Sequence, residues 1–562
     1  MMRRLIAALG LLTLVGCTQI PTSGEVVSID PSTIVREGEV DFLPPGPSAG
    51  ATPEEIIQGF IAAGTAAQDN YRVARSYLTL EFRELWNPNS SVLISTGEMS
   101  AEEVRQGRVE LSVPVVASVD DAGRYDSAAS ATTQVLDFRV SLEAGQWRIV
   151  EAPDGIVLSE TAFREGFESV RVYYYSADFR ELVPDLRWFA SRGDVTTKVV
   201  RGLLEPPSYW LNQGAVVSAF PAGTQLVLSP VPVVDGQAQV DLTDGVLAAD
   251  ETQRARMLWQ LLSTLQQISG ISGVAITVNQ TPVGIPIGLG EQPVLTSGRD
   301  PRPVVVRGRD FGYLQSGRVE SIEALESAVV NLRPERVFYQ AALQQAALVN
   351  TEGLWWIRAG QTPEEPVDIR TGLVRPVIDS CGFLWSMAAE PGDTGNLRVF
   401  QSGPGGESIE SIPVELSLPP DSSVVAFELA RDNTRMMLVL QGESGTRVAL
   451  AAIQRGTDCT PAAIGEFLEL SPLPGTAIDA AFVDEHQVAV ATVEAGAGEV
   501  FVQDVAGRVS SLGRPSGPVT LVGGVGGIPG LRMLSDQGLV YQPRGNGWQA
   551  TGESASVLVT QR

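Results

Sequence analysis

Apolar positions recur with the helical period of about 3.6 residues in four segments of the first half of the chain. Residues 53–64 present an apolar face directly after Thr52, the first residue of a capping-box pattern. A second apolar stripe runs over residues 71–86. Two further helices are predicted, each starting directly after an aspartate that can cap it, over residues 195–205 and 251–268.

Alternation with period two predicts strands between and after these helices. Residues 132–142 and 146–152 flank the short loop 143–145, which is typical of a β-hairpin. A second hairpin is predicted at Asp235-Gly236, because this dipeptide favours the tight turn that joins two adjacent strands. Further strands are predicted over residues 109–119, 169–176, 186–190, 237–243 and 274–283.

From about residue 300 onward the pattern changes to short apolar strands separated by turns rich in Gly, Asp and Asn. One unit of strand, polar turn and strand recurs five times at spacings of roughly 30 to 50 residues. Residues 431–435, Arg-Asp-Asn-Thr-Arg, resemble the blade turn of TolB-like propellers. We therefore expect residues 300–562 to form a β-propeller of roughly five to seven blades at ~45 residues each. A pair of β-sandwiches is the alternative.

Composition narrows the class of protein. The chain has 562 residues, which is too many for one hydrophobic core, and its 44% hydrophobic content indicates folded domains. A net charge of −26 opposes nucleic-acid binding, because the protein would repel the phosphates. Anionic membrane surfaces are equally unattractive to such a body. After the first 16 residues no apolar run is long enough to span a membrane.

The first residues have the features of an export signal. Arg3 and Arg4 precede a short apolar run that ends in Leu-Val-Gly-Cys at 14–17. This ending resembles the bacterial lipobox. The resemblance implies a signal peptide over residues 1–16, cleavage between Gly16 and Cys17, and a lipidated Cys17 carrying S-diacylglycerol and N-palmitoyl groups. Residues 17–50 are expected to be a tether. The alternative is a short buried helix with a core cysteine.

Two cysteines remain after Cys17. Cys381 and Cys459 form an even pair, and in an exported domain such a pair predicts one disulfide. The alternative is two separate buried thiols.

Candidate catalytic groups are few. The only histidine, His486, stands in an acidic turn and is interpreted as a solvated turn residue. Asp241 and Asp244 are interpreted as caps of strand and turn ends rather than as metal ligands. The prolines around residues 46–50 exclude a strand before Gly-Pro-Ser-Ala-Gly, which therefore cannot be a nucleophile elbow. Trp355-Trp356 could stack on sugars, although strand alternation places one of them in the core. No catalytic residue, metal site or cofactor is predicted.

The order of elements resembles known domains. Two helices followed by an antiparallel sheet over residues 51–165 resemble the cystatin-like cone of nuclear-transport-factor-like domains. Residues 168–287 resemble the GerMN domain, on the turn and strand DGQAQVDLT at 235–243 and the helix and strand that close at Asn279-Gln280. The resemblance brings no catalytic residues with it. The expected fold is an α+β N-terminal half followed by an all-β propeller.

Lipobox, cone-like domain, GerMN-like domain and propeller, in this order, resemble the LpqB family of actinobacterial lipoproteins. The residues after the lipobox, CTQIPTSG at 17–24, are also similar to the start of mature members. The resemblance implies a membrane-anchored, extracytoplasmic, non-enzymatic protein. Its implied partner is the extracytoplasmic domain of the sensor histidine kinase MtrB of the MtrA–MtrB system, in cell-envelope homeostasis and division. The alternatives are a module that binds cell-wall glycan and, third, an envelope hydrolase with carboxylates in the propeller channel.

Overall fold

The fold is that of a computed structural model. It describes residues 44–285 and 300–562, apart from 362, 393–394, 404–407, 420, 444 and 524–525. The predicted signal peptide, Cys17 and most of the predicted tether lie outside the described residues. Within the described residues no helix is long and apolar enough to cross a membrane.

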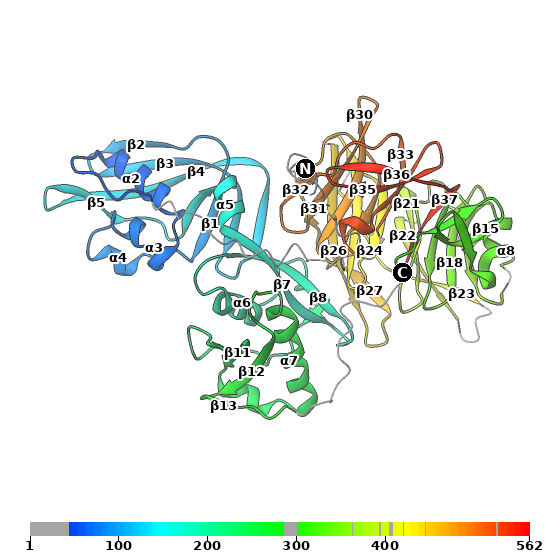
Figure 1. The fold of residues 1–562 in the computed structure, drawn as a ribbon, viewed down its shortest axis with the longest axis horizontal. Coiled ribbons are helices and arrows are strands. Elements are labelled where there is room, and N and C mark those ends of the chain that lie inside the picture. Colours follow the sequence, from blue (N-terminus) through cyan, green and yellow to red (C-terminus); the bar gives the residue numbers. More distant parts are fainter. Residues whose placement is uncertain are drawn as a thin grey trace, which may run out of the picture. The chain divides into compact units, whose positions relative to one another are not determined.

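The N-terminal domain packs short helices against one curved sheet (Figure 1). Thr52 caps the first helix, and Glu55 completes the predicted capping box by binding the Thr52 backbone N–H at 2.9 Å. The sheet has the order β5-β4-β3-β1-β6, with β2 also paired to β3. The helices are α2 (Pro53–Ala63), α3 (Gln68–Arg75), α4 (Phe82–Leu85) and α5 (Glu160–Gly166). The strands are β1 (Ser91–Ser95), β2 (Ser100–Arg105), β3 (Arg108–Asp120), β4 (Tyr125–Glu143), β5 (Gln146–Glu151) and β6 (Ile156–Ser159).

The predicted helix over residues 71–86 is wrong in part. The structure has two short helices, α3 and α4, with an extended segment between them. Tyr77 and Thr79 in this segment exchange backbone hydrogen bonds with Ile149 of β5. The backbone groups that would continue the helix are therefore used to extend the sheet, and the apolar stripe is buried against the sheet instead.

The middle domain contains both predicted helices and the predicted hairpin. Asp194 and Asp250 cap α6 and α7 through their side chains, and Asp235-Gly236 turns between β10 and β11 with positive φ at both residues. The helices are α6 (Val195–Leu204) and α7 (Glu251–Leu265), with a 3-10 turn η2 (Asp244–Ala248). The strands are β7 (Phe167–Ser176), β8 (Leu182–Ala190), β9 (Val216–Val217), β10 (Val233–Val234), β11 (Gln237–Asp241), β12 (Gly273–Val278) and β13 (Thr281–Pro282).

The C-terminal domain, from β14 to β37, is built almost wholly of antiparallel strands. Its first strands are β14 (Val304–Arg307), β15 (Asp310–Gln315), β16 (Arg318–Ser321), β17 (Arg336–Gln340), β18 (Gln345–Asn350), β19 (Gly353–Arg358), β20 (Val377–Ile378), β21 (Leu384–Gly392), β22 (Gly395–Ser402) and β23 (Ile409–Ile412). Then follow β24 (Ser423–Leu429), β25 (Arg435–Gly442), β26 (Gly445–Arg455), β27 (Pro461–Ile464), β28 (Leu468–Glu469), β29 (Thr476–Phe482), β30 (Gln487–Glu494), β31 (Ala497–Asp504) and β32 (Val509–Ser511). The last are β33 (Pro518–Val522), β34 (Arg532–Ser535), β35 (Leu539–Arg544), β36 (Gly547–Ser554) and β37 (Val557–Gln561). The domain also contains the helix α8 (Glu323–Asn331) and a short 3-10 turn, η3 (Ile528–Gly530).

These strands form successive sheets arranged as a propeller. The first strand of one sheet contacts the first strand of the following sheet: β24 lies against β29, and β29 lies against β33. β33 in turn lies against the last strand, β37. The last strand, β37, pairs antiparallel with β14 and parallel with β17, which joins the end of the domain to its beginning. The all-β, propeller-like architecture is therefore confirmed, whereas the number of blades stays a prediction.

The cores of the propeller lie between neighbouring sheets. Trp355 and Trp356 point to opposite faces of β19 and enter two different cores. Both are buried, because both faces of this sheet are covered by other elements. The hypothesis that these tryptophans could stack on sugars is therefore wrong, and the expectation that strand alternation places only one of them in the core is wrong as well.

Candidate functional site: a junction of three domains and the propeller axis

Strands β7 and β8 of the middle domain contact both neighbouring domains. Their apolar side chains share one buried core with residues of β24, β26 and β29 in the propeller. On the other side, Arg187 of β8 forms an isolated antiparallel bridge with Arg124 of the N-terminal domain. We call this region, where the three domains meet around β7 and β8, the junction.

Arg187 joins the N-terminal and middle domains. Its guanidinium is fully buried and donates hydrogen bonds to Asp185, at 2.9 and 3.1 Å, and to the Tyr174 hydroxyl at 2.9 Å. It also donates to the carbonyl oxygens of Pro206 in the middle domain and Ala122 in the N-terminal domain, at 2.8 and 3.4 Å. Burial disfavours the charge, but Asp185, Tyr174 and Asp120 together outweigh this cost and raise the pKa of Arg187.

Two glycines permit the close approach of backbones around Arg187. A Cβ atom on Gly123 would lie 2.9 Å from the Phe189 ring and from the Trp188 carbonyl oxygen. A Cβ atom on Gly202 would lie 2.9 Å from the same ring. Larger residues at either position would force the N-terminal domain away from β8.

The indole of Trp188 joins the junction to the propeller. Its Nε1–H donates to the Ala506 carbonyl oxygen at 3.1 Å, and the Arg508 guanidinium lies 5.3 Å from its ring centre. Gly507, between them, lies directly under the Tyr125 ring of the N-terminal domain, with no room for a side chain. The loop between β31 and β32 therefore contacts both other domains.

A second bond to the propeller starts from β7. The Tyr173 hydroxyl donates to the Glu485 carboxylate at 2.7 Å, and burial followed by this negative charge raises the pKa of Tyr173. The Glu485 carbonyl oxygen accepts from Arg435 at 2.6 Å, and Arg435 is paired with Asp432 at 2.6 Å. Arg435 and Asp432 belong to the TolB-like turn 431–435, and both are buried at the junction, whereas Arg431 of the same turn is exposed.

The prediction that His486 is a solvated turn residue is wrong in part. His486 does lie in the turn between β29 and β30, with its Nδ1 3.0 Å from the Asp484 carboxylate. The turn is half-buried, because the His486 carbonyl oxygen accepts from Val505 N–H at 2.8 Å where two loops of the junction meet. His486 and Asp484 have no nucleophile among their described contacts.

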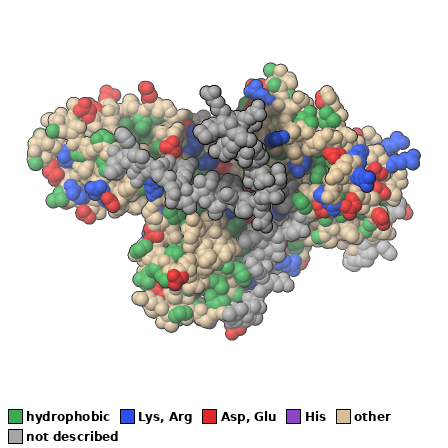
Figure 2. All heavy atoms as spheres, in the orientation of Figure 1, with side chains coloured by type: hydrophobic (Ala, Val, Ile, Leu, Met, Phe, Trp, Pro, Cys, Tyr) green, Lys and Arg blue, Asp and Glu red, His purple; other side chains and the backbone are tan. Residues whose placement is uncertain are grey.

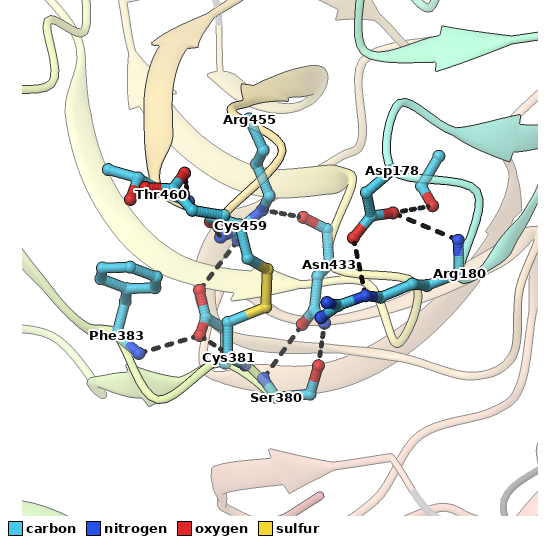
Figure 3. Close-up of a disulfide and its surroundings, with 12 residues drawn as sticks. Asp178, Arg180, Ser380, Cys381, Phe383, Asn433, Arg455, Cys459 and Thr460 are labelled. Carbon is cyan, nitrogen blue, oxygen red and sulfur yellow. Dashed lines mark hydrogen bonds and ion pairs between the residues drawn. A yellow bond between two sulfur atoms is a disulfide. The ribbon is translucent and has the colours of Figure 1, made fainter.

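Cys381 and Cys459 are joined by a disulfide that links the β20–β21 turn to the β26–β27 loop (Figure 3). Beside it, Arg455 donates to the Cys459 carbonyl oxygen at 2.9 Å and to the Asp379 carboxylate at 2.9 Å. On the opposite side, Asp178 and Arg180 of the β7–β8 turn close a cavity of about 300 Å³. The disulfide thus braces the face of the propeller that meets the middle domain.

A small cavity lies at the end of the propeller axis that faces away from the junction. The inner strands β24, β29 and β33 each contain a β-bulge near their first residues, at Val425, Ile478 and Val519. These three apolar residues line one cavity of about 40 Å³, which we call the axis mouth. Each strand runs from the axis mouth toward the junction, so that the two lie at opposite ends of the strands.

Charged residues also line the axis mouth, namely Glu335, Arg336, Arg375 and Asp479. The Asp479 carboxylate is paired with Arg375 and accepts from Leu521 N–H at 2.8 Å. Burial raises the pKa of Asp479, and it likewise raises the pKa of Glu428, which accepts from Phe482 N–H at 3.0 Å. The carboxylates of Asp479 and Glu428 are thus bonded within the fold. A cavity of about 40 Å³ is far smaller than the 300–1,000 Å³ of ordinary ligand pockets.

A larger cleft of about 490 Å³ lies between the N-terminal and middle domains. It is lined by Lys198, the only lysine of the chain, and by Arg201 one turn further along α6. Burial lowers the pKa of Lys198, and Asp194 opposes this effect. Asp121 and Glu205 also line the cleft, so its charge is mixed.

Asp241 has the predicted capping role. Its carboxylate accepts from the Thr277 hydroxyl at 2.6 Å and from Gln280 N–H at 2.8 Å, which ties β11 to the turn after β12. Asp244 begins the 3-10 turn η2. Among the described residues no group of three or more His, Cys, Asp or Glu side chains could hold a metal ion.

Sequence reasoning missed Arg187, Tyr173 and the bulged residues of the axis mouth. An arginine within the apolar run of β8 is a signal for a buried pair, because buried arginines need partners. The bulges have no such signal, because Val425, Ile478 and Val519 match the alternation of ordinary strands. Cys17, the predicted lipidation site, lies outside the described residues.

Comparison with known families follows the same three domains. Residues 46–164 match the model of the lipoprotein LpqB N-terminal domain, and residues 313–557 match that of the lipoprotein LpqB beta-propeller domain. Residues 171–284 match a model described as sporulation and spore germination. The chain belongs to the LpqB family of lipoproteins. It is an LpqB-type protein of the cell envelope, and the family name indicates a membrane anchor.

Relatives named lipoprotein LpqB occur in several actinobacteria. The chain is 26% identical to the protein from Thermobifida fusca, over 93% of its own length and 92% of the relative. It is 26% identical to that from Bifidobacterium longum, over 81% and 80%, respectively. The match to the Cutibacterium acnes protein, at 28% identity, covers 52% of this chain and 49% of that relative.

Among solved structures, the chain is similar to the first GerMN domain of the sporulation protein GerM from Bacillus subtilis. The identity is 15% and the TM-score 0.19, over 22% of this chain and 97% of that domain. The assignment of the middle domain rests on the family model and on its order of elements, not on this likeness.

Proposed function

We propose that the chain is an extracytoplasmic accessory lipoprotein, anchored through a lipidated Cys17, that binds the sensor kinase MtrB and modulates MtrA–MtrB signalling. The kinase and the system come from the family resemblance. The observation that carries the proposal is the junction, because it couples the propeller to the domain nearest the anchor. A partner bound to the propeller is thereby held at a defined place relative to the N-terminal domain.

We further propose that the kinase domain docks on the axis mouth. One end of the propeller axis is already covered by the junction, whereas the axis mouth at the other end is open. Val519 is 48% exposed there, and it stands in a strand whose bulge turns it out of the regular alternation. The cavity admits a single side chain of a partner rather than a cofactor or a sugar. To change signalling, the chain must bind two kinase conformations with different affinity.

A non-enzymatic role is part of this proposal. Glu335 is exposed where it lines the axis mouth, whereas the carboxylates of Asp479, which also lines it, and of the deeper Glu428 already have partners within the fold. These two carboxylates therefore lack the open approach that a hydrolase would need for its substrate. Glycan binding by stacking has little support, because all nine tryptophans are described and none is exposed.

The test is calorimetric titration of the unlipidated body, Thr18 to Arg562, into the purified extracytoplasmic domain of the kinase. Deleting a domain would expose the core shared at the junction, so the whole body is used with surface variants. We expect saturable one-to-one binding that Val519→Asp weakens by about tenfold or more. Ile369→Asp, at a site 74% exposed elsewhere on the propeller, is the matched control.

The outcomes separate the alternatives. Binding that is unchanged in Val519→Asp would remove the axis mouth as the docking site while leaving the accessory role in place. No heat at high concentration of both proteins would contradict the accessory role. Retention of the body on isolated peptidoglycan, in that case, would favour the glycan-binding alternative.

A further inference from the structure

The end of the β4–β5 hairpin exposes apolar side chains that the fold leaves without partners. Leu142, near the end of β4, is 60% exposed although it follows Phe138 and Val140 on the face of the strand that is buried elsewhere. Leu80 is 67% exposed, and its N–H donates to the Glu143 carboxylate at 3.3 Å, which places it beside the hairpin. We call Leu80, Leu142 and the half-buried Trp147 the hairpin tip.

Leu142 and Trp147 are directly paired across the two strands. Leucine and tryptophan are side chains that proteins place at the boundary between lipid headgroups and acyl chains. In Figure 1 the hairpin ends at one extremity of the N-terminal domain, and Figure 2 shows hydrophobic side chains at the surface there.

The described chain begins beside Ser76 and Tyr77, a few residues before Leu80. The Tyr77 hydroxyl donates to the Pro45 carbonyl oxygen at 3.0 Å, and Gly46 lies beside Ser76. Tyr77 is three residues from Leu80, and Arg148 acts electrostatically on its hydroxyl. The first described residues therefore contact the segment that directly precedes Leu80.

We infer that the hairpin tip rests in the membrane interface, so that the N-terminal domain lies on the bilayer that carries the anchor. The inference rests on the lipid anchor of the proposed function. Pro44 comes twenty-seven positions after Cys17, a span of at most about 95 Å, so the domain stays within reach of the bilayer. Three apolar side chains bind a membrane weakly by themselves, but an attached chain raises their effective concentration.

The experiment couples the Cys17 thiol of the full mature chain to a maleimide phospholipid in liposomes of phosphatidylcholine. Chemical coupling makes the test independent of lipidation in the cell, and Cys381 and Cys459 are spared because they are bonded to each other. Hydrogen–deuterium exchange is then compared between the coupled chain and the same chain free in solution.

We expect the amides of residues 143–147 to exchange about tenfold more slowly on liposomes. Leu80→Asp with Leu142→Asp should abolish this protection, and Ile369→Asp should leave it unchanged. Equal exchange in the coupled and free chains would overturn the inference. Protection that appears only when the kinase domain is added would also overturn it and assign the hairpin tip to the protein partner. Failure of kinase binding in the titration leaves this result unaffected.

Discussion

The Tyr173 hydroxyl donates a 2.7 Å hydrogen bond to the Glu485 carboxylate, and this bond joins the middle domain to the propeller. The two residues are far apart in sequence but meet because β7 lies against the turn between β29 and β30. Tyr173 is buried, so the bond forms largely away from water, where a lost partner is costly.

Tyr173→Phe should lower the free energy of unfolding by about 1–2 kcal/mol, because a bond to a charged acceptor is lost. The measurement is chemical denaturation of the single variants and of Tyr173→Phe with Glu485→Gln as a double-mutant cycle. The double variant should lose little more than either single variant. Additive losses would show that the two side chains do not interact. Tyr209→Phe is the control, because Tyr209 is 54% exposed.

Arg187→Met should destabilise the protein by about 3–5 kcal/mol, because it removes one partner of a buried ion pair and leaves Asp185 uncompensated. Arg187→Lys should rescue little, since an ammonium cannot reproduce the planar set of bonds that the guanidinium makes. Arg72→Met, at an ion pair on the surface, should change stability by less than about 0.5 kcal/mol.

Limited proteolysis locates the effect of Arg187→Met. Cleavage should rise first near residues 120–124, the N-terminal turn that the Arg187 side chain holds against β8. A variant as resistant as the wild type in this turn would show that Arg187 contributes stability without fixing the two domains to each other.

Replacing both cysteines, Cys381→Ser with Cys459→Ser, should lower the free energy of unfolding by about 4–5 kcal/mol. The bond closes a loop with a sequence separation of 78, which restricts the unfolded chain. Calorimetry with and without a reductant is the measurement. A reductant should lower the Tm of the wild type and leave that of the double variant unchanged. Equal Tm values for wild type and variant would contradict the prediction.

The folded protein should lose stability in alkali because of Tyr71. Burial raises the pKa of Tyr71 to about 12, from an ordinary value of 10.0. The folded state therefore binds the hydroxyl proton more tightly than the unfolded state. This contribution is complete below pH 10 and is lost as the pH rises toward about 12, with a total of about 2.7 kcal/mol.

Tyr71→Phe should reduce the fall in unfolding free energy between pH 10 and pH 12 by a similar amount, because phenylalanine has no proton to lose. The measurement is chemical denaturation of both proteins across this range. Parallel stability curves for the two proteins would show that the Tyr71 hydroxyl already titrates normally in the fold.

Local signals in the sequence decided much of the secondary structure. Thr52, Asp194 and Asp250 begin the helices that they were predicted to cap, since a side-chain cap acts within four residues. Asp235-Gly236 forms its hairpin for the same reason, because the turn needs only the positive φ of its own residues. The order of these elements, with the recurrent strands after residue 300, was enough to predict an α+β half followed by a propeller.

Only the tertiary structure decided the features that depend on contacts between distant parts of the sequence. The helix predicted over residues 71–86 is broken because Ile149, distant in sequence, offers Tyr77 and Thr79 a strand to pair with. The junction at Arg187 and Tyr173, the half-buried His486 turn and the bulged axis mouth likewise depend on partners outside their own segments, such as Ala122 for Arg187 and Glu485 for Tyr173. Such contacts are set by how the domains and sheets close on each other, and a pattern of polar and apolar residues along one segment does not contain that information.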